Sequence, residues 1–270
     1  MTLGELAKMF NGENNMGVQL KVIPMQGYRR DMWFDETGLA WVNPSPNLRS
    51  LTQAILYPGV ALSEASNVSV GRGTQTPFEV LGAPWIRSEE LTAHLRDRRI
   101  PGVEFEPAAF TPDASVFKGQ PCNGIRIVLK DRGSLNSVGL GIEILCALQR
   151  LYPRVFHLDA AIGLIGSRSV LRAIADGLEP ESIAASWQPR LDEFRRLRAS
   201  YLFYIRLYFC ILMEKSHDHG QNTDRLAPKT GKEAKANNPA VRGVEVKINK
   251  TGRLIQYVYL LICKPKKNYR

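Results

Sequence analysis

The sequence predicts a fold of the α/β or α+β class, in which helices pack on a mixed sheet and a basic, poorly ordered tail follows. The chain has 270 residues, of which 44% are hydrophobic, so it can bury a substantial core. Segments with helical spacing and segments with strand-like alternation are interspersed over residues 1–204. Residues 205–270 are polar and Lys-rich over much of their length, which favours disorder. We therefore divide the chain after Tyr204.

The first half of the chain contains three predicted elements. Thr2 and Glu5 have the spacing of a capping box, and the apolar residues from Leu3 to Phe10 follow at helical spacing. Residues 18–25 alternate as a strand does, and residues 51–57 have the pattern of a short helix.

The second half alternates between helices and strands. A charged helix is expected over residues 88–99. Two β-prone runs then predict strands, and three segments with an apolar helical face predict helices. These strands cover residues 103–105 and 124–130, and these helices cover residues 136–151, 167–175 and 191–204.

The net charge of +10 lies almost entirely in the tail. Up to Tyr204 there are 22 Lys and Arg against 21 Asp and Glu, whereas after it there are 14 against 5. The body of the protein is thus close to neutral, so we expect no nucleic acid partner. The tail is interpreted either as an appended extension or as a basic tether to an anionic polymer or membrane surface.

Several classes of site are not supported. The four cysteines are widely spaced and have no histidines at metal spacing, so neither a metal site nor a disulfide framework is expected. Residues 71–74 lack the Gly-Lys-Ser/Thr ending of a P-loop, and residues 139–141 lack the third glycine of a dinucleotide loop. The apolar run over residues 201–213 contains Arg206 and is too short to span a membrane. No export signal and no cofactor are indicated.

The unusual residues cluster in loops over residues 24–87, where we expect a polar small ligand to bind. Residues 24–31 place Arg30 just after a predicted strand. Residues 43–47 form a rigid Asn-Pro-Ser-Pro-Asn turn, in which Asn47 offers a side-chain amide to hydroxyl or acetamido groups. The alternative is a structural loop whose polar groups satisfy one another.

The densest run of such residues extends from Glu64 to Trp85. Glu64 ends an apolar stretch, which is expected to leave its carboxyl partly desolvated, as suits a general acid. Arg72 lies between two glycines, where a guanidinium and backbone amides bind a carboxylate or phosphate. Trp85 is a candidate to stack on a sugar ring, with core packing as the alternative. Glu79 is an alternative partner for Arg72 in a structural salt bridge.

Taken together, these motifs resemble the DUF1343 family, which includes exo-β-N-acetylmuramidases. The resemblance covers residues 1–204 and rests on the order and spacing of its motifs. They are Tyr28-Arg-Arg-Asp-Met32, Trp41-Val-Asn-Pro-Ser-Pro-Asn47, Tyr57-Pro-Gly59, Ser69-Val-Gly-Arg-Gly-Thr74, Pro77-Phe-Glu79, Gly82-Ala-Pro-Trp85 and Cys122-Asn-Gly124.

The resemblance implies a glycoside hydrolase that removes N-acetylmuramic acid from the non-reducing end of peptidoglycan fragments. It implies that Glu64 is a catalytic or substrate-orienting carboxylate and that Arg72 binds the lactyl carboxylate. Asn67, Ser69 and Asn47 would hold hydroxyl or acetamido groups.

The chain departs from the family pattern in one respect: it is expected to correspond to the C-terminal portion and to lack the Rossmann-like N-terminal domain. That domain is an expected partner. Glycosidases generally need two carboxyl groups, so a non-catalytic module that binds muramyl sugars is the alternative function. The family's substrate implies a periplasmic or extracellular location.

Overall fold

A computed structural model of the protein describes residues 1–204, which fall into two compact units. The terminal unit contains residues 1–38 and 191–204, and the central unit contains residues 39–190. The tail predicted for residues 205–270 lies outside the described residues. Among the helices of the described part, none is long and apolar enough to cross a membrane.

The terminal unit begins with α1 (Leu3–Glu13), as the capping box predicts. The Thr2 side chain accepts a hydrogen bond from the Glu5 backbone, and the Glu5 carboxylate accepts one from the Thr2 backbone. A short 3-10 helix (Phe34–Thr37) follows, and the end of α7 (Pro180–Ala199) also belongs to this unit. The strand predicted over residues 18–25 is wrong, since no strand pairs with this segment within residues 1–204.

The central unit contains an antiparallel sheet in the order β1-β3-β2. Its strands are β1 (Val80–Ala83), β2 (Val103–Phe110) and β3 (Cys122–Leu129), so both later strand predictions are confirmed and extended. Because both pairings between the three strands are antiparallel, so that the sheet is not mixed, the fold is of the α+β class. Burial alternates along the first half of β2, as in a sheet with one covered face.

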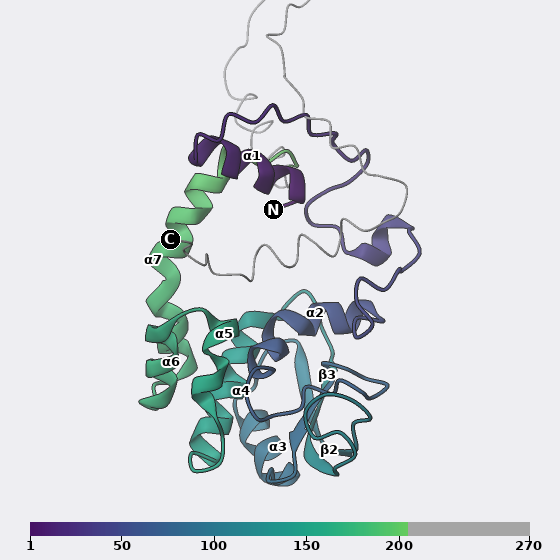
Figure 1. Cartoon of the computed structure of the whole chain (residues 1–270), viewed down its shortest axis with the longest axis vertical. Helices are drawn as coiled ribbons and strands as arrows, with labels where there is room; N and C mark the ends of the chain where they lie inside the picture. The colour runs from purple at the N-terminus through teal and green to yellow at the C-terminus, as the bar shows by residue number, and fades with distance from the viewer. Residues whose placement is uncertain (205–270) are drawn as a thin grey trace, which may run out of the picture. The chain divides into compact units, whose positions relative to one another are not determined.

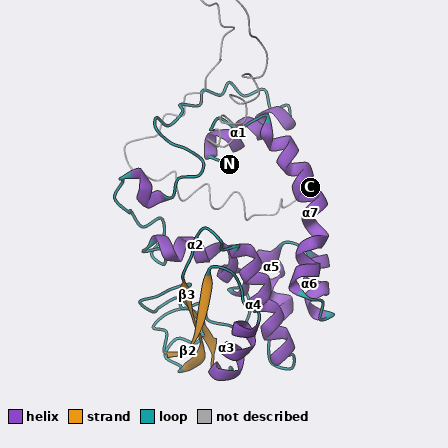
Figure 2. Ribbon diagram, turned by 180° about the vertical axis from the view of Figure 1, so that it is seen from behind, coloured by secondary structure: helices purple, strands orange, loops and turns teal. Residues whose placement is uncertain are grey.

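Helices supply most of the remaining structure of the central unit. Side chains at the N-caps explain where several begin, because Ser50, Asn136 and Ser167 each accept a hydrogen bond from a backbone amide of the first turn. The helices are α2 (Leu51–Val60), α3 (Ser88–Asp97), α4 (Ser137–Leu151), α5 (Ile162–Ile165) and α6 (Arg168–Ala175), with 3-10 turns at Ala61–Ser63 and Leu158–Ala161. Figure 1 shows their course along the chain, and Figure 2 shows α3 and α4 on one side of the sheet.

Two glycines let α2 and α4 cross in direct backbone contact. A Cβ atom at Gly59 would lie 1.8 Å from the Ser137 carbonyl oxygen, and one at Gly141 would lie 2.4 Å from the Gly59 carbonyl oxygen. The Ser137 hydroxyl also accepts a hydrogen bond from the Gly59 backbone, at 3.1 Å. The separation of these helices is therefore set by backbone atoms, and the apolar core packs around the crossing.

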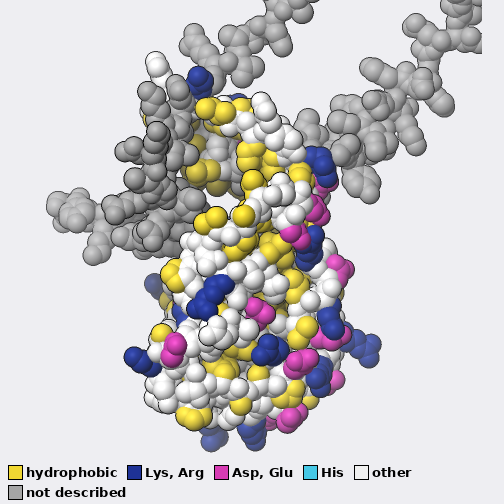
Figure 3. All heavy atoms as spheres, turned by 90° about the vertical axis from the view of Figure 1, so that its right-hand side faces the viewer, with side chains coloured by type: hydrophobic (Ala, Val, Ile, Leu, Met, Phe, Trp, Pro, Cys, Tyr) yellow, Lys and Arg dark blue, Asp and Glu magenta, His cyan; other side chains and the backbone are white. Residues whose placement is uncertain are grey.

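Charges are dispersed over the surface of the central unit. Figure 3 shows Lys and Arg side chains interspersed with Asp and Glu on the visible face, and neither sign gathers into a continuous patch. One cluster of ion pairs joins Arg98 to Glu143, Glu179 and Glu181, and Arg150 also pairs with Glu179. This arrangement agrees with the near-neutral charge of residues 1–204.

Candidate functional site

The predicted site centres on the turn over residues 71–74, whose two glycines are required by geometry. Gly71 and Gly73 have φ values of 78° and 77°, in the left-handed region that other residues disfavour. A Cβ atom at Gly73 would also lie 2.3 Å from the backbone nitrogen of Ala114. The Thr74 hydroxyl closes the turn by donating to the Gly71 carbonyl, at 2.7 Å. The backbone on both sides of Arg72 is thereby fixed.

Glu64 and Arg72 form a bidentate ion pair. The Arg72 Nε donates to Glu64 Oε1, and Nη2 donates to Oε2 at 3.1 Å. Both side chains are partly open to solvent, with 28% of Arg72 and 27% of Glu64 exposed. The guanidinium also lies over the ring of Phe78, 5.3 Å from its centroid. The sequence placed both residues in the candidate site but did not predict that they pair with each other, and the Glu64 carboxyl expected to be partly desolvated is instead bonded to Arg72.

One edge of the Arg72 guanidinium stays open. Glu64 occupies the Nε and Nη2 side, which leaves the Nη1 and Nη2 side without an acceptor in the described part of the chain. An arginine can bind one carboxylate on each of these two edges, because its five N–H groups form a planar fork. The arrangement can therefore hold one carboxylate of the protein and one of a ligand.

Glu79 does not pair with Arg72, so that alternative is wrong. Its carboxylate accepts a hydrogen bond from the side chain of Gln53, at 3.1 Å. Gln53 is 3% exposed and also accepts from the Arg49 backbone, at 2.7 Å. Arg49 in turn donates to Gln75 at 3.4 Å. Neither Gln53 nor Arg49 was predicted from the sequence, because their only signal is their position beside the Asn-Pro-Ser-Pro-Asn turn.

Asn67 and Ser69 support the backbone around the site. The Asn67 amide donates to the Val155 carbonyl at 2.7 Å and accepts from the His157 backbone at 2.8 Å. Ser69 is 3% exposed, its backbone pairs with Gly82, and its hydroxyl accepts from the Gly71 backbone at 3.3 Å. Both polar side chains are therefore engaged within the protein.

Asn47 has a different environment. It lies in a turn closed by the Ser45 to Leu48 backbone pairing, and the Trp41 indole donates to the Leu48 carbonyl at 3.3 Å. The Asn47 side-chain amide is half-buried and has no hydrogen-bond partner within residues 1–204. Since Arg49 links this turn to Gln75, the Asn47 turn adjoins the loop that carries Arg72.

Trp85 packs as a core residue does. Its ring lies 5.4 Å from that of Tyr152 and 6.4 Å from that of Phe156, centroid to centroid. The indole nitrogen is buried without a hydrogen-bond partner in the described part of the chain. The structure thus shows the packing that sequence analysis gave as its alternative for Trp85.

Arg30 belongs to the terminal unit and takes part in a buried cluster there. It is ion-paired with Glu5, and its Nε donates to the Tyr204 carbonyl at 3.1 Å. Glu5 is fully buried and also accepts from the backbones of Phe203 and Thr2, at 2.8 and 2.6 Å. Burial opposes ionisation of Glu5, but these hydrogen bonds and the Arg30 charge outweigh it and hold its pKa at about 2.

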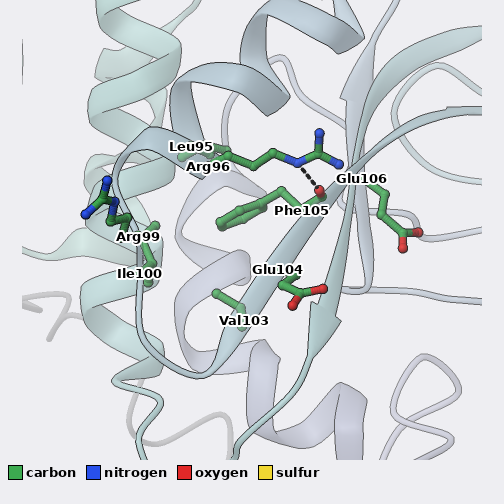
Figure 4. A pocket seen from close by; sticks show the side chains of 8 residues that line it. All are labelled: Leu95, Arg96, Arg99, Ile100, Val103, Glu104, Phe105 and Glu106. Atoms are coloured by element: carbon green, nitrogen blue, oxygen red, sulfur yellow. Dashed lines mark hydrogen bonds between the residues drawn. The ribbon is translucent and has the colours of Figure 1, made fainter.

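Three pockets lined by described residues do not include Arg72. One of about 340 Å³ lies between α3 and the start of β2, where the Arg96 guanidinium donates to the Phe105 carbonyl at 2.8 Å (Figure 4). None of the predicted site residues lines it. No group of three or more His, Cys, Asp or Glu suited to a metal ion occurs within residues 1–204.

Comparison with protein families finds two matches. Residues 1–52 match the family model described as exo-beta-N-acetylmuramidase NamZ, N-terminal, and residues 55–204 match the corresponding C-terminal model. The family boundary thus falls near residue 53, inside the segment that the sequence analysis assigned wholly to the C-terminal portion.

Individual relatives agree with the family models. The chain is 37% identical over 207 residues to the peptidoglycan beta-N-acetylmuramidase NamZ of Bacillus subtilis, which is 76% of this chain and 50% of that protein. It therefore spans about half the length of this curated relative. Two crystal structures of DUF1343 family proteins from Bacteroides fragilis are each 27% identical, with TM-scores of 0.61 and 0.55. They match 75% and 76% of this chain, and 56% and 55% of their own chains.

Proposed function

Because this chain belongs to the exo-β-N-acetylmuramidase NamZ family, we propose that it supplies the sugar-binding side of a glycoside hydrolase. The substrate is the non-reducing terminal N-acetylmuramic acid of peptidoglycan fragments. The proposal agrees with the name of the Bacillus subtilis relative, of which the chain spans half. The rest of the N-terminal domain is the proposed partner in catalysis.

The open edge of Arg72 carries this proposal. N-acetylmuramic acid differs from N-acetylglucosamine by a lactyl group that ends in a carboxylate, and a guanidinium fork binds a carboxylate in two parallel hydrogen bonds. Glu64 holds the guanidinium in one orientation, so little side-chain freedom remains to be lost on binding. Asn47, whose amide has no partner within the described residues, is proposed to bind an acetamido or hydroxyl group.

The same ion pair assigns a role to Glu64. A carboxylate that is bonded through both oxygens to Arg72 is suited to orienting that residue rather than to donating a proton. Asn67 and Ser69 then act as supports of the loop, because their polar atoms are engaged with backbone groups. Two carboxyl groups across the scissile bond are needed for hydrolysis, and the partner domain is proposed to supply at least one.

A non-catalytic module for muramyl sugars is the second candidate function. The observation that favours it is that Glu64 and Glu79 both have partners within the protein, Arg72 and Gln53. In this case the chain binds the sugar through Arg72 and releases no product.

Two measurements on the full chain decide between these functions. Calorimetry with N-acetylmuramic acid and N-acetylglucosamine measures binding, and release of para-nitrophenol from the two corresponding glycosides measures hydrolysis. We expect a preference for N-acetylmuramic acid that Arg72→Lys lowers about tenfold or more, because lysine lacks the planar fork. Arg126→Lys, on the exposed side of β3, is the matched control and is expected to change nothing.

The possible results separate the alternatives. Binding with product release supports the hydrolase, and binding without release supports the binding module. If the chain binds neither sugar, or if Arg72→Lys keeps the full preference for N-acetylmuramic acid, the assignment of Arg72 is wrong.

A further inference from the structure

Phe78 has a backbone conformation that phenylalanine disfavours. Its φ is 65°, and it follows Pro77 in a turn that the Glu79 N–H closes by donating to the Thr76 carbonyl, at 3.1 Å. A proline at the second position and a positive φ at the third are the features of a type II turn, where the third residue is usually glycine or asparagine. Phenylalanine costs conformational free energy here, so its side chain is expected to make an interaction that glycine could not.

Neighbouring backbone groups hold Phe78 in this conformation. Its N–H donates to the Val70 carbonyl at 2.8 Å, and this hydrogen bond closes the base of the loop over residues 71–77. The Glu79 carbonyl accepts from the backbone N–H of Ile127 in β3, at 2.7 Å. The loop therefore returns to the sheet at Phe78, so the sheet fixes where the Phe78 side chain points.

The buried ring of Phe78 supports the guanidinium of Arg72. The ring is fully buried, and its centroid lies 4.9 Å from that of Tyr57 in an edge-on contact. The Arg72 guanidinium carbon lies over the ring, 5.3 Å from its centroid. An aromatic face attracts a cation electrostatically, and the attraction is stronger where water is excluded. Because the ring has no acceptor atom, it attracts the Arg72 charge without occupying the N–H groups that Glu64 leaves open.

We propose that Phe78 positions Arg72 to bind the carboxylate of the ligand. Glu64 holds one edge of the guanidinium by two hydrogen bonds, and the Phe78 ring restrains the guanidinium from a second side. The remaining edge is thereby presented in one orientation, so little freedom is left to be lost when a carboxylate binds. Since Phe78 is fully buried, it acts through Arg72 and does not touch the sugar. Phe78 is therefore a positioning residue that determines specificity for an acidic sugar.

The role of Phe78 rests on the proposed function, because N-acetylmuramic acid supplies the carboxylate. It also accounts for a phenylalanine at a turn position that favours glycine. Glycine would relax the turn but would leave no ring beneath the Arg72 guanidinium. The restraint on Arg72 can be measured without a sugar, so the two proposals can fail separately.

Two replacements of Phe78 in the full chain remove the attraction of the ring while they keep the turn. Phe78→Leu retains an apolar side chain and the same unfavourable φ. Site-specific replacement of Phe78 by trifluorophenylalanine keeps the shape of the ring almost unchanged and withdraws electron density from its face. In calorimetry with N-acetylmuramic acid and N-acetylglucosamine, each replacement is expected to lower the preference for N-acetylmuramic acid about fivefold. Binding of N-acetylglucosamine is expected to stay unchanged.

Phe105 is the matched control, because it is almost as buried as Phe78 and lies outside the site. It is 2% exposed and belongs to β2, beside the pocket of Figure 4, which Arg72 does not line. The same two replacements of Phe105 are expected to leave the sugar preference unchanged. Urea titration shows whether each variant is folded and measures the stability that both leucine variants lose with the core volume of the ring.

The second readout is the solvent exchange of the Arg72 Nε–H, which donates to Glu64. Heteronuclear NMR measures this exchange, and the signal is identified as the one that Arg72→Lys removes. Both replacements of Phe78 are expected to accelerate the exchange about threefold or more, because the guanidinium loses a restraint. The replacements of Phe105 are expected to leave it unchanged.

The outcomes separate the two proposals. If the wild-type chain prefers N-acetylmuramic acid, the inference is overturned when the fluorinated replacement of Phe78 leaves that preference unchanged, or when the replacements of Phe105 lower it equally. If the wild-type chain shows no preference, the assignment of the sugar fails. In that case an exchange that responds to Phe78 still supports the restraint on Arg72, whereas an unchanged exchange overturns it as well. Where Phe78→Leu does not fold, the fluorinated chain decides.

Discussion

Replacing Glu5 by glutamine is expected to loosen the terminal unit and to remove the acid dependence of its stability. Glu5 is fully buried, and its carboxylate joins α1 to Arg30 and to the backbone of Phe203. Glutamine has nearly the same size but no charge, so it keeps the packing while it weakens each charge-assisted hydrogen bond. The variant thus tests the electrostatic contribution separately from the shape of the side chain.

The magnitude follows from the pKa of Glu5. Its pKa is about 2 in the folded protein against an ordinary value of 4.5. Because the folded-state value is the lower one, the stabilisation is fully present above pH 4.5 and is lost as the pH falls towards 2. The difference corresponds to about 3 to 4 kcal/mol, or a factor of about three hundred in the equilibrium for opening the unit.

Native-state hydrogen exchange of the α1 amides, between pH 3 and pH 6, is the measurement. Wild-type protection is expected to decline over this range as the pH is lowered, while Glu5→Gln shows weaker protection with little pH dependence. Glu13→Gln is the control, because Glu13 is an exposed glutamate of the same helix. A glutamine at this position can still accept the hydrogen bond that the Tyr201 hydroxyl donates to Glu13. Equal protection of α1 in wild type and Glu5→Gln at pH 6 would refute the reasoning.

Three further predictions concern the central unit. Gly141→Ala is expected to destabilise the protein by more than about 3 kcal/mol, because the new Cβ would lie 2.4 Å from the Gly59 carbonyl oxygen. Urea titration measures this loss, and an unchanged unfolding midpoint would contradict the close crossing of the two helices. Asn67→Ala is expected to cost about 2 kcal/mol in the same titration through the loss of two hydrogen bonds, and a loss below about 0.5 kcal/mol would show that they are not formed. Burial raises the pKa of the Cys146 thiol to about 12. Alkylation of Cys146 at pH 8, monitored by peptide mass spectrometry, is therefore expected to be on the order of a thousandfold slower than alkylation of a free thiol. Rapid labelling of Cys146 would refute this expectation.

The helices were largely predictable from the sequence, because their signals are local. The capping box at Thr2 and the N-caps at Ser50 and Asn136 lie within a few residues of the bonds they make. The strands were less predictable. β1 was missed because all four of its residues are buried and show no alternation, and residues 18–25 alternate correctly but have no neighbouring strand within the described residues.

The site was predictable only where its contacts are short-range. Glu64 and Arg72 are eight residues apart, and sequence analysis placed both in the site. The partners of Asn67 lie 88 and 90 residues further along the chain, and no local pattern indicates them. Asn67 was therefore assigned to substrate binding, although the structure shows its amide engaged with the backbone.

The close contact of α2 and α4 at Gly59 and Gly141 is the point about which α2 would tilt. Gly59 lies near one end of α2, close to Glu64, whereas the Asn47 turn lies beyond the other end. A tilt of α2 by about 5° about this point would hardly move Glu64, yet it would shift the start of the helix, roughly 12 Å away, by about 1 Å. The hydrogen bond from Gln53 to Glu79 restrains the part of α2 that lies before Gly59. The ion pair of Glu64 and Arg72 and the Asn47 turn therefore differ in how far such a tilt would move them, because Glu64 lies close to the pivot and the turn lies at the far end of the helix.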